Sequence, residues 1–182
     1  MALAPAGGWV VGDPALPQTL ALFTEWQATF RTLAPHADAI ARTTEGRRRV
    51  LSAMTSRLEH IPPELVVEVL NSTAYCPGTQ PLIEAALREG YSVDAERITC
   101  PVRVVWGTED TILPWPSTAA RYLHEWLPHA DWVELDGVGH CPQLDVPLET
   151  AQLILGFAGA TAAHTRPRSA SSGGGVRQRD AR

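Results

Sequence analysis

The sequence lacks the features of a membrane or secreted protein. It has no run of about 20 apolar residues, the length that a membrane-spanning helix needs. Its first eight residues carry no basic side chain and are too short for a secretory leader. Its three cysteines, Cys76, Cys100 and Cys141, fit neither a disulfide framework nor the ligand spacing of a zinc site. These absences predict a protein without a membrane segment, in a reducing, cytoplasmic setting.

An excess of positive charge is also missing. The chain has 15 lysines and arginines against 20 acidic residues, and its formal net charge is −5. This balance gives no general reason to expect nucleic acid as a partner. What the chain does have is 182 residues, of which 45% are hydrophobic, and this is enough for one domain with a real core.

The composition divides the chain into zones. Residues 1–10 have the pattern of the end of a core strand followed by a loop. Residues 11–95 are predicted to be helical, because apolar residues recur there at helical spacing. The predicted helices are 17–33, 45–58, a helix opened by Pro62 and Pro63, and 80–88. Residues 160–182 are poor in hydrophobic residues and rich in Ser, Gly and Arg, which predicts a disordered tail.

Residues 96–159 have a different pattern. Two compact apolar stretches, 102–106 and 131–135, are predicted strands. A helix is predicted between them at 117–127, and another begins near Pro147. The apolar residues expected on the inner face of this last helix are Leu148, Ala151, Ile154 and Phe157. The alternation of strand and helix predicts an α/β fold class, with a short parallel sheet covered by helices.

An aspartate and a histidine each follow one of these predicted strands. Asp110 ends the stretch Trp-Gly-Thr-Glu-Asp, and His140 ends the stretch Gly-Val-Gly-His. The carboxyl ends of parallel strands are where open α/β sheets place their ligand crevices. An imidazole can accept and return a proton near neutral pH, and a carboxylate can orient it. We therefore predict that Asp110 and His140 are the acid and the histidine of a nucleophile–histidine–acid triad.

Simpler alternatives exist for both residues. An aspartate after a strand is often only a turn former, and a histidine in a glycine loop is often only a polar loop residue. Glu109 is a second candidate for the acid, with a less apt position in the motif. The nucleophile is missing, because no Gly-x-Ser-x-Gly occurs in the sequence. The remaining histidines show no metal-ligand spacing, so a metal site is not expected. No phosphate-cradling glycine motif precedes a helix, so no cofactor is expected.

Residues 98–157 resemble the C-terminal part of α/β-hydrolase-fold enzymes. In that family a strand ends in Gly-x-x-Asp, as at Gly107–Asp110, and a later loop reads Gly-x-Gly-His, as at Gly137–His140. The resemblance implies that 11–95 is a helical cap or lid and that 96–159 is the C-terminal core segment. It also implies that 1–10 is the end of the core strand before the cap. The first five strands, the oxyanion loop and the nucleophile elbow of the family have no counterpart here.

The resemblance further implies a hydrolase that acts on an ester or other acyl bond of a small apolar substrate. This chain would supply only the acid and the histidine, and the nucleophile, serine or aspartate in this family, stays open. The aromatic residues expected to line a substrate pocket are Trp9, Phe23, Trp26 and Phe30. Plain packing between the helices and the sheet is the simpler explanation of these aromatic residues.

Three accounts of the chain compete. It is a truncated piece of a serine hydrolase, a non-catalytic ligand-binding module, or an interaction protein that completes a separate N-terminal half-domain. We favour the first account, because Asp110 and His140 both lie in well-formed local motifs, which a pure binding role does not require.

Overall fold

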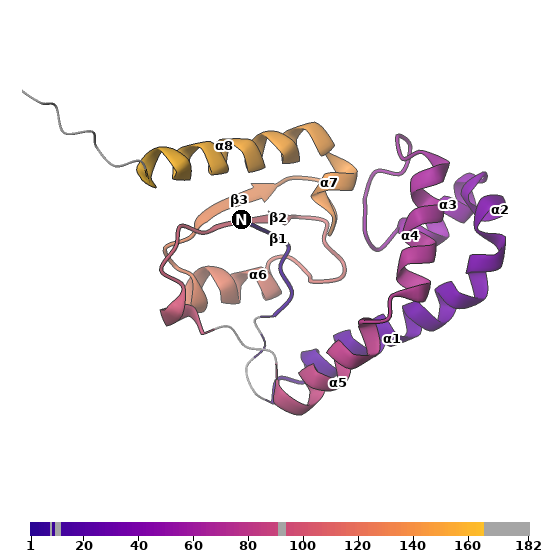
Figure 1. Ribbon diagram of the computed structural model, residues 1–182, viewed down its shortest axis with the longest axis horizontal. Helices are drawn as coiled ribbons and strands as arrows, with labels where there is room; N and C mark the ends of the chain where they lie inside the picture. The colour runs from indigo at the N-terminus through magenta and orange to yellow at the C-terminus, as the bar shows by residue number, and fades with distance from the viewer. Residues whose placement is uncertain (8, 10–11, 91–93, 166–182) are drawn as a thin grey trace, which may run out of the picture.

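A short parallel sheet forms the base of the structure (Figure 1). The computed structural model describes residues 1–7, 9, 12–90 and 94–165. Within these residues the sheet has three strands, in the order β1 (Ala2–Leu3), β2 (Arg103–Gly107) and β3 (Asp131–Leu135). Both neighbouring pairs are parallel. The strands predicted at 102–106 and 131–135 are confirmed to within one residue.

Helices cover both faces of this sheet (Figure 1). One face carries α6 (Ser117–Arg121), which continues as a π-helical turn, Tyr122–Trp126, and the other carries α8 (Pro147–Thr165). Successive residues of β2 point to opposite faces. Val104 packs in the apolar cluster with α6, whereas Val105 packs in the cluster on the side of α8. Burial on both faces explains why β2 is almost continuously apolar.

The remaining helices form a second part of the molecule, called here the helical part, beside the sheet (Figure 1). It begins with α1 (Ala15–Leu33), followed by a 3-10 turn at Ala34–His36. The other helices of this part are α2 (Ala37–Ala41), α3 (Thr44–Leu51), α4 (Pro63–Tyr75) and α5 (Thr79–Glu89). Buried apolar side chains of α1, α2, α3 and α4 form its core.

One apolar cluster connects the sheet to the helical part. The cluster under β2 contains Val104 and Trp106 from the strand and also Leu20 and Ile83 from α1 and α5. The sheet and the helical part therefore share buried apolar surface, which fixes the position of one against the other. Among the described residues, no helix has the length and apolar content to cross a membrane.

The structure corrects two predictions about helix ends. The helix predicted at 45–58 ends at Leu51, and residues 52–62 form turns and an extended segment before α4. Residues 160–165, which were predicted to belong to a disordered tail, are helical, because α8 continues to Thr165. Residues 166–182, the rest of the predicted tail, lie outside the described residues.

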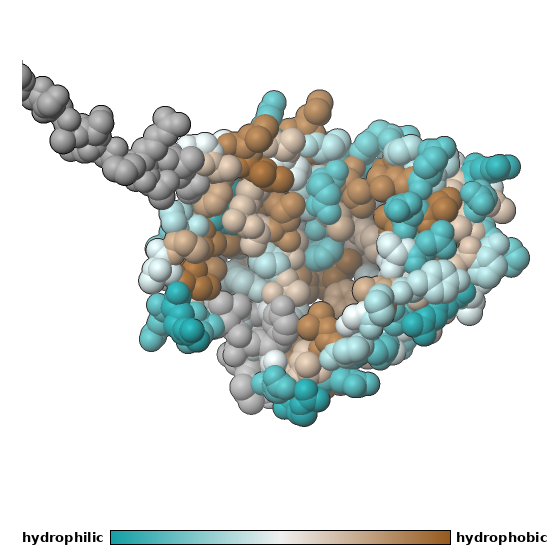
Figure 2. Space-filling model, viewed as in Figure 1, coloured by the Kyte–Doolittle hydropathy of each residue, from teal (hydrophilic) through white to brown (hydrophobic). Residues whose placement is uncertain are grey.

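The buried face of α8 also differs from the prediction. Leu148 is 80% exposed and Ile154 is 45% exposed, and Ala151 is exposed as well. Figure 2 shows apolar side chains on the surface over this helix. The residues that face the sheet are Thr150, at 1% exposure, and the half-buried Leu153, which packs against the cluster around Val105. Of the predicted residues, Phe157 is half-buried, and the Arg103 guanidinium of β2 lies 5.1 Å from its ring centroid. Because a threonine occupies the inner face while leucine and isoleucine point outward, apolar periodicity alone could not identify that face.

Candidate active site

Asp110 lies in a turn directly after β2, with a side chain that is fully buried. Its Oδ1 accepts hydrogen bonds from the backbone N–H of Ile112 at 2.9 Å and of Leu113 at 2.8 Å. The aspartate is thus a turn former, as one alternative held, and this role occupies only one of its two oxygens. The second oxygen, Oδ2, remains available for another partner.

That partner is His140, which follows β3. The distance between His140 Nδ1 and Asp110 Oδ2 is 2.9 Å. Because a carboxylate can only accept, the imidazole donates through Nδ1–H, and in the neutral ring Nε2 is then the basic nitrogen. The His140 side chain keeps 21% of its surface exposed. Glu109, the alternative acid, is exposed. The structure therefore places Asp110, rather than Glu109, against His140.

Backbone contacts hold the two loops together at the sheet edge. The N–H of Thr108 donates to Leu135 O at 3.0 Å, and the N–H of Glu109 donates to Val138 O at 2.9 Å. Gly107 lies so close to the opposite loop that a Cβ atom there would be 2.1 Å from Val138 O. Only glycine fits in this position, and it lets the two loops approach closely enough for the side chains beyond them to meet.

A second buried carboxylate next to the histidine was not predicted from the sequence. Asp145, the last residue of α7 (Pro142–Asp145), is 3% exposed. It accepts hydrogen bonds from the loop before His140 and from the segment that follows α3. The signal that could have indicated it is a lone acidic residue between the apolar neighbours Leu144 and Val146, close to Pro147.

An apolar cavity of about 420 Å³ lies between the helical part and the segment that follows β1. Three of the predicted pocket residues, Trp9, Phe23 and Trp26, line it. Phe30 does not: it is buried in the core of the helical part and borders a second cavity of about 210 Å³. Phe30 is seven residues beyond Phe23, which places it roughly 10 Å further along α1.

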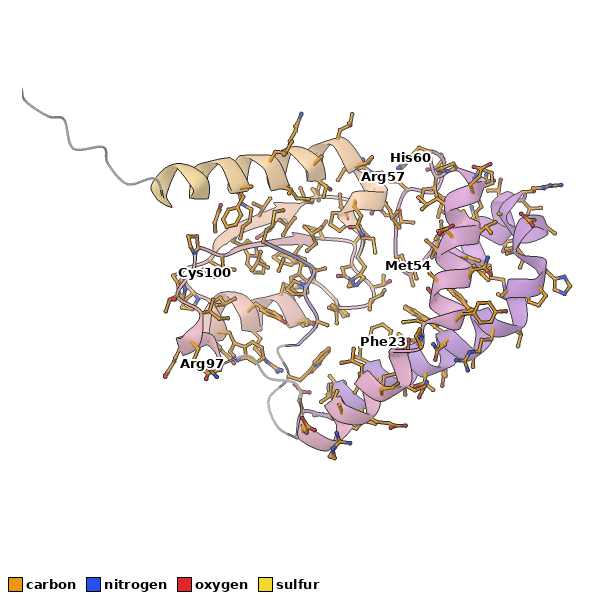
Figure 3. The ribbon with its side chains drawn as sticks, in the orientation of Figure 1. Phe23, Met54, Arg57, His60, Arg97 and Cys100 are labelled. Carbon is orange, nitrogen blue, oxygen red and sulfur yellow. The ribbon has the colours of Figure 1, made fainter. Side chains whose placement is uncertain are left out.

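The cavities are connected to the histidine loop through two residues. Trp26 lines both cavities, and Met54 lines the second one. The carbonyl oxygen of Met54 accepts a hydrogen bond from the N–H of Cys141, the neighbour of His140, at 2.7 Å. Figure 3 shows Phe23 and Met54 on the side of the helical part that faces the sheet. Neither cavity is lined by Asp110 or His140 themselves.

Cys141 is next to His140 but is not an activated nucleophile. Burial, together with the negative charges of Asp110 and Asp145, raises the pKa of its thiol to about 11. The thiol is therefore protonated at neutral pH, and the protonated form is a poor nucleophile. Within the part of the chain that the structure describes, no three His, Cys, Asp or Glu side chains are grouped to hold a metal ion.

Comparison with known proteins identifies the fold. No family model matches the sequence. The chain is 25% identical over 166 residues to "Epoxide hydrolase EphH" of Mycobacterium tuberculosis, covering 90% of this chain and 77% of that protein. It is 30% identical over 108 residues to "Putative carbamate hydrolase RutD" of Cronobacter turicensis, covering 58% of this chain and 39% of that protein.

A solved structure agrees with these relatives. The "putative lipase (lip1)" of Acinetobacter baumannii matches with a TM-score of 0.50 at 21% identity, over 69% of this chain and 44% of that chain. The chain therefore has a partial α/β-hydrolase fold, and both curated relatives are named as hydrolases. It spans less than half the length of the carbamate hydrolase and of the lipase.

The close approach at Gly107 predicts that a methyl group added at this residue destabilises the fold. In Gly107→Ala, the new Cβ meets backbone oxygens that cannot rotate away, so we expect a loss of about 1–3 kcal/mol in the free energy of unfolding. Gly156→Ala, in α8, is the control, because nothing lies within 4 Å of its Cβ position. That variant should gain about 0.5–1 kcal/mol. Urea denaturation measures both, and an unchanged Gly107→Ala would contradict the close approach.

The cysteines should differ sharply in reactivity. Hydrogen bonds from the Thr79 side chain and the Gly78 backbone lower the pKa of the exposed Cys76 thiol, whereas that of Cys141 is raised to about 11. At pH 8 only roughly one Cys141 thiol in a thousand is ionised, so iodoacetamide should modify Cys76 quickly and Cys141 slowly. Peptide mass spectrometry after timed alkylation measures this difference. Equal rates at the two cysteines in the folded protein would contradict it.

Proposed function

We propose that this chain forms the acid and histidine part of a hydrolase. The observation that carries the proposal is the contact between His140 Nδ1 and the buried Asp110 Oδ2. In this arrangement His140 Nε2 takes a proton from a nucleophile and returns it to the leaving group. Asp110 holds the ring in the required tautomer and stabilises the imidazolium that forms. The two curated relatives described above are both named as hydrolases, which supports this assignment.

The nucleophile comes from a segment outside these 182 residues. The sequence contains no Gly-x-Ser-x-Gly, and the thiol of Cys141 is protonated at neutral pH. The hydroxyl of Ser56, which lies near the histidine loop, is already engaged as a hydrogen-bond donor to Gly137 O at 2.8 Å. We propose that an N-terminal half-domain, in the same polypeptide or in a partner, supplies a serine or an aspartate. Residues 1–10 and 96–159 are then part of the hydrolase core, and 11–95 form its cap.

The 420 Å³ cavity is the proposed binding site for the apolar part of the substrate. Trp9 and Ala6, which line it, follow β1 and so leave the sheet at its carboxyl edge, as Asp110 and His140 do. The lining is almost wholly apolar, which favours an acyl chain or a ring over a charged group. We propose an ester or another acyl bond of a small apolar molecule as the substrate.

A second function, ligand binding without catalysis, is favoured by one specific observation. The apolar cavity is built from α1, α4, α5 and the segment after β1, without any contribution from Asp110 or His140. A ligand can therefore bind there whether or not a nucleophile is supplied. The chain then acts as a binding or interaction module, and binding is not followed by turnover.

Substitution of the pair tests the hydrolase proposal. The assay uses the protein isolated from its own cells, with whatever segment or partner accompanies it, and p-nitrophenyl butyrate as substrate. We expect His140→Ala and Asp110→Asn to lower turnover by about 10³- to 10⁴-fold, because each removes a member of the triad. The matched controls are His36→Ala and Asp38→Asn, which change exposed residues of the helical part. Wild-type rates in both site variants would refute the proposed roles.

Filling the cavity tests the binding site separately from the chemistry. Ala86 is buried and lines the cavity, whereas its neighbour Ala85 does not. We expect Ala86→Phe to weaken binding of 1-naphthyl butyrate about tenfold, which corresponds to about 1.4 kcal/mol, and Ala85→Phe to change it little. Isothermal titration calorimetry measures the affinity. Equal affinities for the two variants would mean that the ligand binds elsewhere, and binding without hydrolysis would favour the second function.

A further inference from the structure

Asp145 is a buried carboxylate that is surrounded by hydrogen-bond donors. Its Oδ1 accepts from the Thr55 hydroxyl and from the N–H of Arg57 at 2.8 Å. Its Oδ2 accepts from the N–H of Gly139 at 2.6 Å and from the N–H of Ser56 at 3.3 Å. Within the described residues no arginine forms an ion pair with it, so these four donors alone compensate a buried charge.

The four donors come from two separate parts of the molecule. Thr55, Ser56 and Arg57 belong to the segment that connects α3 to α4 in the helical part, whereas Gly139 immediately precedes His140 in the loop after β3. Figure 3 shows Met54, Arg57 and His60 along this connecting segment, beside α7. A single carboxylate therefore joins the helical part to the loop that carries the histidine.

Further contacts join the connecting segment to the histidine loop and to α7. The Ser56 hydroxyl bonds to Gly137 O at 2.8 Å, and the His60 Nε2 lies 2.6 Å from Leu144 O. A Cβ atom at Gly139 would be 3.1 Å from Ser56 N, so the two backbones touch with almost no space between them. The loop before His140 therefore lies directly against the connecting segment, and Asp145 is the residue that bonds to both.

We propose that Asp145 is a positioning residue that transmits the position of the helical part to His140. The inference rests on the proposed role of His140 as the proton carrier. Asp145 does not compete with Asp110 for the imidazole, because protein donors other than the histidine already bond to both of its oxygens. A shift of the connecting segment, such as one caused by a ligand in the neighbouring cavities, then moves Gly139 and the histidine that follows it.

The chemistry requires a carboxylate in this position. A carboxylate has acceptor sites for about four hydrogen bonds and no donor, which matches the four donors around it. In Asp145→Asn, an amide NH₂ would face backbone N–H groups that need an acceptor. Buried donors left without a partner are costly, so we expect the segment around Thr55 and the loop around Gly139 to open more often.

The test uses the full chain in three forms: wild type, Asp145→Asn and Glu149→Gln. The last is the control, since it removes the charge of an exposed acid four residues further along. Amide hydrogen exchange at Ser56, Arg57 and Gly139 should become roughly tenfold to hundredfold faster in Asp145→Asn only. In ¹⁵N-histidine spectra, recorded well below the melting temperature, the Nδ1–H signal of His140 should weaken or disappear in that variant. The signal is assigned to His140 by its absence from the spectrum of His140→Gln.

Two results would overturn the proposal. One is wild-type exchange in Asp145→Asn, and the other is faster exchange with an unchanged His140 signal, which would make Asp145 a purely structural residue. If Asp145→Asn does not fold, Thr55→Val replaces it, because that variant keeps the carboxylate and removes one donor; the same two results then decide. None of these measurements involves hydrolysis. A protein that shows the expected changes in Asp145→Asn but hydrolyses no ester would therefore refute the proposed function and leave the role of Asp145 standing.

Discussion

The parallel pairing of β2 with β3 is the constraint on which the site depends. Gly107, the last residue of β2, pairs with Leu135, the last residue of β3, so both strands end at the same edge of the sheet. Gly107 then lets the following loops approach within contact distance. A shift of the register by one residue would separate Asp110 from His140, which lie 30 positions apart in the chain.

Two buried carboxylates, those of Asp110 and Asp145, lie near this edge of the sheet, and they have different hydrogen-bond partners. Asp110 uses one oxygen for its own turn and the other for the imidazole, so its geometry is directed at His140. Asp145 uses both oxygens for the backbone and one hydroxyl, so its geometry is directed at the junction with the helical part. Both satisfy the rule that a buried charge needs hydrogen-bond partners.

The helical part contributes apolar surface rather than reactive groups. Its α1 and α5 share a buried cluster with β2, and the same helices line the larger cavity. Trp26 and Met54 then lead from this cavity to Cys141 and the histidine loop. The apolar cavity and the pair of Asp110 and His140 therefore lie in neighbouring parts of the molecule, which are joined by the segment that follows α3.

The sequence by itself determined the strands at 102–106 and 131–135, most of the helices and the two motifs that carry Asp110 and His140, because these follow from local periodicity and from glycine positions. Only the tertiary structure decided which residues share a site. It separated Phe30 from the cavity of Trp9, Phe23 and Trp26, turned Leu148 and Ile154 of α8 outward, and brought Asp145 against Thr55. These outcomes depend on contacts between residues far apart in the chain, which periodicity along one helix or strand does not encode.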